Sequence, residues 1–175
     1  MKYQRAIIVG VIIFTIIEFI LFIVINTHFY KGIFNFSMVI PIFFLQVAMT
    51  YNFLRERLRT KHPRVWLLFF FSVPIIIFLI GKPTYTFMQA ERLVLDEYGD
   101  EISIMDSGEE KFRDTVPIYT EDHRIFITDR DYHFKGVTKT KEHRYFLVNP
   151  RTGEVMEMSQ PYWEAIEKPN NLSFK

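Results

Sequence analysis

Residues 11–26, VIIFTIIEFILFIVIN, form an apolar run that contains a single carboxylate, Glu18. The apolar segment around it extends from Ala6 to Asn26. A helix of about 20 residues, each adding about 1.5 Å, covers the roughly 30 Å hydrocarbon core of a bilayer. The sequence therefore predicts a membrane-spanning helix over residues 6–26, with an ionisable group near its middle.

Two further apolar segments follow, at residues 33–54 and 65–81. The basic N-terminus resembles the start of a signal peptide, but the first apolar run is too long for one and no small-residue cleavage motif follows it. We therefore expect it to be retained, and we expect residues 1–82 to form a region of three transmembrane helices. Pro41 and Pro74 fall near the centres of the second and third segments, where proline favours a kink.

Basic residues indicate how these spans are oriented. The first 81 residues hold eight Lys and Arg against two Glu, whereas the remainder holds 13 basic and 18 acidic residues. Half of the loop at residues 55–64 is basic: Arg55, Arg57, Arg59, Lys61 and Arg64. Because Lys and Arg beside spans stay in the cytoplasm, we expect the N-terminus and this loop inside and everything after residue 81 outside. We interpret the loop as a topology determinant that contacts anionic lipid, and not as a nucleic-acid site.

Glu18 is out of place near the predicted bilayer midplane, where an ionised side chain costs several kcal/mol. It should therefore face protein or water. Antiparallel packing of the spans brings Gln46 of the second span close to it, and the third span offers Ser72. A hydrogen bond from Glu18 to Gln46 or Ser72 would join the helices, at roughly 0.6–2 kcal/mol. Alternatively, Glu18 is a proton or ligand site, or it docks a charged partner helix.

Residues 83–175 are predicted to form a small soluble α+β domain. The pattern at residues 86–99 is that of a helix: Thr86 and Gln89 can form a capping box, and the apolar residues fall on one stripe. Gly99 ends this helix.

Strands are predicted after this helix. Residues 102–104, 123–128 and 143–148 are rich in β-branched and aromatic side chains. The sequence NPRTG at residues 149–153 predicts a hairpin turn whose glycine takes a positive φ.

The helix ending in DEYGDE, the strand after it and the phrase YFLVNPRTGEVMEM at residues 145–158 resemble the PepSY-type extracytoplasmic modules of bacteria. The resemblance covers residues 87–158. In that family a helix packs on antiparallel strands, and the modules are binding, inhibitory or regulatory appendages. The resemblance implies no catalytic residue, and it implies that the domain binds a partner protein or an envelope ligand.

Three histidines are spaced evenly along the domain. His123 and His143 begin two similar runs, HRIFITD and HRYFLVN, and His133 lies midway. The simplest interpretation is two strands of one sheet with a basic start and an apolar middle. Alternatively, the histidines converge with Asp122 or Glu142 into a zinc or copper site, or they sense external acidity, because the reference pKa of histidine lies where extracellular pH varies. No HxH or HExxH pair anchors a metal site, so none is predicted.

Composition and motifs give little support to catalysis. The absence of cysteine excludes disulfides, thiolate metal sites, cysteine catalysis and a lipoprotein anchor. The chain has no glycine-rich phosphate loop, nucleophile elbow or zincin motif, so we predict neither an enzyme nor a cofactor. The first hypothesis is a bacterial multi-pass cell-membrane protein in contact with the lipid bilayer, whose external domain binds a partner protein or envelope ligand and regulates through the spans. The alternatives are an accessory subunit of a transporter or channel, with Glu18 in a helix interface or ion path, and a membrane-bound metallo-enzyme that uses the domain's histidines.

Overall fold

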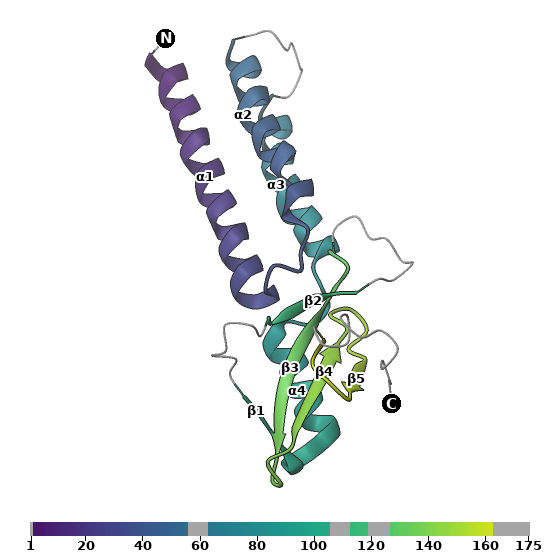
Figure 1. The fold of residues 1–175 in the computed structure, drawn as a ribbon. Coiled ribbons are helices and arrows are strands. Elements are labelled where there is room, and N and C mark those ends of the chain that lie inside the picture. The colour runs from purple at the N-terminus through teal and green to yellow at the C-terminus, as the bar shows by residue number, and fades with distance from the viewer. Residues whose placement is uncertain (1, 56–62, 106–112, 119–126, 163–175) are drawn as a thin grey trace.

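The computed structural model describes residues 2–55, 63–105, 113–118 and 127–162. Three long helices stand beside one another at one end of the molecule, and an α+β domain with an antiparallel sheet lies at the other end (Figure 1). The predicted order of apolar helices followed by an α+β domain is therefore confirmed.

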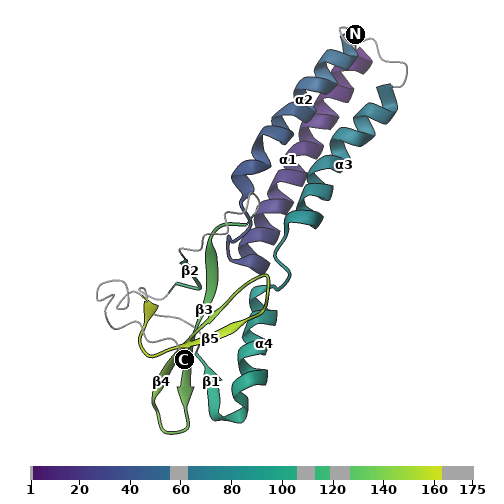
Figure 2. The same cartoon turned by 90° about the vertical axis from the view of Figure 1, so that its right-hand side faces the viewer.

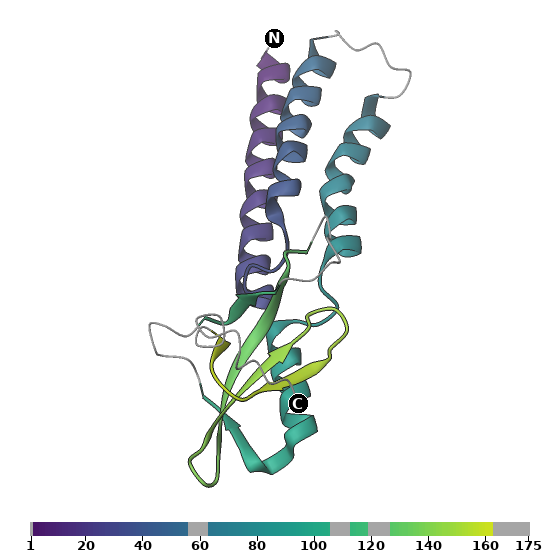
Figure 3. The ribbon, with the colours of Figure 1, turned by 45° about the vertical axis from the view of Figure 1, so that its right-hand side comes forward.

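The helical region consists of α1 (Lys2–Tyr30), α2 (Ile40–Leu54) and α3 (Pro63–Gly81). Helix α2 packs against both of the others and lies between them in Figure 3. Among the described residues, two helical stretches are long and apolar enough to cross a membrane, Ala6–Tyr30 and Phe36–Phe53, and Phe71–Gly81 is a shorter apolar helix.

Aromatic side chains hold the three helices together in the half of the bundle nearer the domain. The ring of Phe22 in α1 meets Phe43 of α2 and Phe78 of α3, at centroid distances of 5.7 and 5.1 Å. Both contacts are edge-to-face, the arrangement that aromatic rings prefer. Phe22 and Phe43 are buried, so these rings form the apolar centre of the bundle.

The second helix begins later than predicted. Residues 31–39 do not continue a span: Lys31 and Gly32 take positive φ angles of 51° and 79°, and a short 3-10 helix, η1 (Phe36–Met38), precedes α2. Pro41 then lies in the first turn of α2, where its missing N–H costs no hydrogen bond, so the predicted kink at the centre of this span is wrong. Pro74 lies inside α3, as predicted.

The sheet is built around its longest strand. Its strands are β1 (Ile102–Ile104), β2 (Thr115–Pro117), β3 (Arg130–Thr138), β4 (His143–Val148) and β5 (Val155–Met158). Strands β1 and β2 both pair with β3, β4 pairs with β3 and β5, and every pairing is antiparallel. Because β1 pairs with residues 136–138 and β2 with residues 130–132, a stretch of β3 between them faces neither strand.

Helix α4 (Phe87–Tyr98) lies alongside the sheet in Figure 2. The predicted capping box is present, since Thr86 accepts from the backbone N–H of Gln89 and donates its own N–H to the Gln89 side chain. Ala90 and Val94 are fully buried on the stripe that faces the sheet. They pack with six buried residues from the rest of the chain: Ile33, Ile102, Tyr132, Phe134, Phe146 and Val148.

The predictions for the strands were partly right. Those at residues 102–104 and 143–148 are confirmed as β1 and β4, but β2 and the central β3 were not predicted. The predicted strand at residues 123–128 lies outside the described residues apart from its last two. The hairpin turn is confirmed, with Gly153 at a φ of 75° and its N–H donated to the carbonyl of Asn149.

The opposite face of the sheet is covered by the segment that follows β5. Val116, Leu147 and Met158 are buried there, and Tyr162 packs against them. The Tyr162 hydroxyl donates to the carbonyl of Pro117. The sheet therefore has an apolar core on each face.

Candidate functional site

A polar cluster lies between α1 and α2, composed of Thr15, Glu18, Gln46 and Thr50, all at most 7% exposed. The Gln46 amide donates to Glu18 Oε2 at 3.1 Å, and the Thr15 hydroxyl donates to Gln46 Oε1 at 3.2 Å. The Thr50 hydroxyl donates to the Gln46 backbone carbonyl at 2.8 Å. The expected contact between Glu18 and Gln46 is thus present, with the amide as donor.

Ser72 is not part of this cluster. Its hydroxyl donates to the carbonyl of Leu68 in its own helix at 2.9 Å. Within the described part of the chain, the second oxygen of Glu18, Oε1, is buried and has no hydrogen-bond partner. Because the carboxylate is enclosed and bonded across the interface between α1 and α2, the geometry favours the interpretation that Glu18 joins the two helices.

The loop between α1 and α2 enters the domain. Ile33 is fully buried in the core between α4 and the sheet. Its carbonyl accepts from both the N–H and the hydroxyl of Thr128, each at 2.8 Å. The Asn26 side chain fixes the other side of the loop, because it donates to the carbonyl of Phe34 and accepts the Phe34 N–H, at 3.0 and 3.1 Å. The loop is therefore held by α1 and by the domain at once.

An ion pair reinforces the contact between the α1–α2 loop and the domain, which we call the junction. Lys31 Nζ lies 2.8 Å from Asp114 Oδ2 and 4.8 Å from the centroid of the Phe87 ring. Lys31 follows α1, Asp114 precedes β2 and Phe87 begins α4, so the contact joins three parts of the chain. About a third of each charged side chain is exposed, which limits the pair to about 1 kcal/mol or less.

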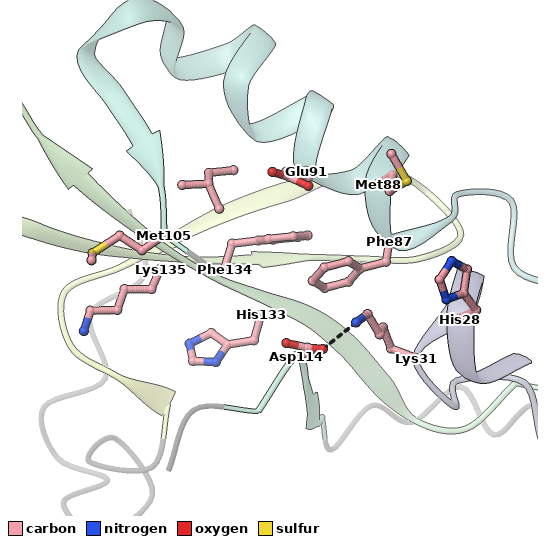
Figure 4. Close-up of a pocket in the computed structure, with 11 residues that line it drawn as sticks. His28, Lys31, Phe87, Met88, Glu91, Met105, Asp114, His133, Phe134 and Lys135 are labelled. Carbon is pink, nitrogen blue, oxygen red and sulfur yellow. Dashed lines mark ion pairs between the residues drawn. The ribbon is translucent and has the colours of Figure 1, made fainter. Parts of the chain in front are cut away.

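A cavity of about 420 Å³ opens at this junction (Figure 4). We call it the junction cavity. Its charged and titratable lining residues come from the end of α1, from α4 and from the sheet and its approach: His28, Lys31, Glu91, Asp114, His133 and Lys135. Figure 4 shows Lys31 between Asp114 and Phe87, with His133 and Lys135 along β3. The cavity thus combines both signs of charge with an aromatic wall.

His133, one of the three predicted histidines, lines the junction cavity, whereas His143 is not among its described lining residues. His133 is fully buried, its Nδ1 lies 3.3 Å from the carbonyl of Arg113, and its ring stacks near that of Tyr145. Burial lowers the pKa of His133 to about 4, although the Arg113 carbonyl and Asp114 oppose the shift. With this pKa, His133 stays neutral at mild external acidity and is poorly suited to sense it.

The structure does not bring His133 and His143 together. His143 is exposed and pairs with Val137, four residues along β3 from His133 and therefore about 13 Å away along the strand. His123 lies outside the described residues. Among those that are described, no group of three or more His, Cys, Asp and Glu could hold a metal ion.

The basic loop is described at its two ends. The Arg55 guanidinium lies 4.6 Å from the centroid of the Tyr51 ring, and Arg64 lies in the first turn of α3. The other three basic residues of the loop lie outside the described residues: Arg57, Arg59 and Lys61. Their predicted role in topology stays a prediction.

Comparison of the chain with protein-family models, with curated proteins and with solved structures finds no match. The resemblance to PepSY-type modules therefore also stays a prediction.

Sequence reasoning missed the residues that build the junction. No sequence pattern singled out Lys31, Ile33 or Asp114. Their contacts join residues far apart in the chain, as with Ile33 and Thr128, which are 95 positions apart. No local pattern could have indicated these contacts.

We expect Gln46→Leu to weaken the packing of α1 on α2, because it removes the donor to Glu18 and leaves a buried carboxylate. Interhelical hydrogen bonds in membranes contribute roughly 0.6–2 kcal/mol, and the unpaired acceptor adds to the loss. The measurement is the free energy of unfolding of the full chain in mixed detergent micelles. Ser72→Ala is the matched control, because the Ser72 hydroxyl bonds its own helix. Equal losses in the two variants would contradict this role of the polar cluster.

The burial of His133 predicts a pH dependence of stability. Its pKa falls from 6.5 to about 4 on folding, so between these pH values the unfolded chain binds a proton that the folded chain does not. The contribution of His133 to the free energy of unfolding is therefore largest above pH 6.5. It decreases by up to about 3 kcal/mol as the pH falls toward 4.

Denaturation of the full chain between about pH 7 and pH 5 measures this slope. His133→Gln should flatten it, whereas His143→Gln, at the exposed start of β4, should leave it unchanged. An unchanged slope in His133→Gln would refute the assignment.

Proposed function

We propose that the chain is an integral membrane protein with three spans and an external α+β domain that binds a partner protein or envelope ligand and regulates through the spans. The observation that carries the proposal is the burial of Ile33, a residue of the loop between α1 and α2, in the core of the domain. A domain whose core includes this loop cannot rearrange without affecting α1 and α2.

Exposed apolar surface supports the membrane location. Only 17% of the most apolar part of α1 is buried within the chain. Ile13, Ile17, Ile20 and Val24 are each more than half exposed. A core helix of a soluble protein would bury such side chains, whereas a bilayer accommodates them.

The junction supports a third span. If α1 and α2 both cross the bilayer, their connecting loop lies on one side and Arg55 on the other. The domain bonds this loop through Thr128, so α3 has to return the chain to the loop's side. Its 19 residues rise about 28 Å, close to the thickness of the hydrocarbon core.

Charge supports an external domain. The basic residues of the loop at 55–64 favour the cytoplasm. The first loop and the domain would then lie outside, and the resemblance to PepSY-type modules implies the same location for the domain. Non-enzymatic binding and regulation is the activity that this resemblance implies.

The geometry gives less support to an accessory subunit that uses Glu18 at its interface. Glu18 is 6% exposed and accepts a hydrogen bond from Gln46 within the same chain. A partner helix could reach it only by displacing the side chains that now cover it. We therefore favour the regulatory proposal.

Single cysteines test this topology, because the chain has none of its own. Three exposed positions are suitable: Ser37 after the first loop, Arg55 after α2 and Arg151 in the β4–β5 hairpin. We expect a membrane-impermeant maleimide to label Ser37→Cys and Arg151→Cys in intact cells, and Arg55→Cys only after lysis. Labelling of Ser37→Cys and Arg151→Cys on opposite sides of the membrane would refute both the third span and the junction.

A further inference from the structure

The junction cavity has the size and construction of a ligand site. Its volume of about 420 Å³ lies within the range usual for small-molecule pockets. Its walls come from the end of α1, from α4 and from the sheet with the segment before β2, so an occupant would touch both the helical bundle and the domain. The polar cluster between α1 and α2 is a separate feature in the middle of the bundle.

Charged residues of both signs line the cavity. Among the described residues these are Lys31, Lys135, Glu91 and Asp114. A ligand that carries one charge of each sign matches this lining better than a simple anion or cation. Lysine ammonium groups are good partners for phosphate oxygens.

Lys31 can serve such a ligand although it already pairs with Asp114. Their ion pair is about one-third exposed and therefore weak. A phosphate offers more acceptor oxygens than one carboxylate, so Lys31 can bind it while remaining close to Asp114. Glu91, on α4, can accept an ammonium group of the same ligand.

The remaining wall is apolar and open. Phe87 is half-buried, whereas Met88 and Met105 are 62% and 48% exposed on the rim. His28 joins them from the last turn of α1. Because the apolar part of α1 ends here, the cavity would open at the level of the lipid headgroups in the proposed topology.

We propose that the junction cavity binds the headgroup of a zwitterionic phospholipid, with its phosphate at Lys31 and its ammonium at Glu91. The inference rests on the proposed membrane topology and names the ligand of the external domain. A phosphate that carries an ammonium group could also come from a water-soluble phosphoamine. The apolar rim and its position at the end of α1 favour the lipid.

The test is saturation binding of short-chain dioctanoyl phosphatidylethanolamine to the full chain in non-ionic detergent. Lys31→Gln and Glu91→Gln should each weaken binding about tenfold, because each removes a charged partner. Lys139→Gln and Glu101→Gln are the matched controls, at exposed positions outside the lining, and should bind as the unmodified chain does. Lack of saturable binding, or equal losses in the controls, would overturn the proposal.

Two further probes separate the sources of the ligand. Dioctanoyl phosphatidylglycerol has the phosphate without the ammonium, and O-phosphoethanolamine has the headgroup without acyl chains. We expect both to bind more weakly than the zwitterionic lipid. Equal binding of the glycerol lipid would overturn the role of Glu91, and equal binding of O-phosphoethanolamine would overturn the lipid assignment. Binding in detergent does not depend on the side of the membrane on which the domain lies. A cysteine-labelling result that refutes the topology can therefore be distinguished from a binding result that refutes the ligand.

Discussion

The insertion of Ile33 into the core of the α+β domain is the contact on which the arrangement of the molecule depends. Burial of an isoleucine side chain contributes about 1.5–3 kcal/mol, and its carbonyl receives two hydrogen bonds from Thr128. Positive φ angles at Lys31 and Gly32 turn the chain away from the helical axis and direct it into the domain. The helices and the sheet are thereby joined through residues of this loop.

Helix α1 is consequently fixed at two levels. Near its middle, Glu18 and Gln46 bond it to α2, and near its end Asn26 holds the backbone of Phe34. The aromatic rings around Phe22 fill the space between these levels. A force applied to the loop from the domain would therefore reach the middle of the bundle along packed side chains. This is a physical route by which a change at the domain would alter the packing of α1 on α2.

The features that could be predicted from the sequence are those encoded by neighbouring residues. The capping box of Thr86 and Gln89, the stop at Gly99 and the turn at Gly153 each lie within a few positions of the element that they define. The central strand β3 was missed because it starts with polar residues. Buried Asp131 and His133 occupy positions where a half-buried strand usually has solvent-facing side chains.

Of the two candidate sites, the polar cluster could be predicted from the sequence and the junction cavity could not. Glu18 and Gln46 could be paired from the sequence because antiparallel helices of known length fix which residues lie level with each other. The junction cavity could not, because it forms only when the end of α1, α4 and the sheet have assembled. The same dependence means that the cavity needs residues from both the helical region and the domain. A domain that begins at residue 83 would lack Ile33 in its core and Lys31 beside Asp114. It would keep its own helix and strands but lose a wall of the cavity and the contact through which an occupant could act on the helices.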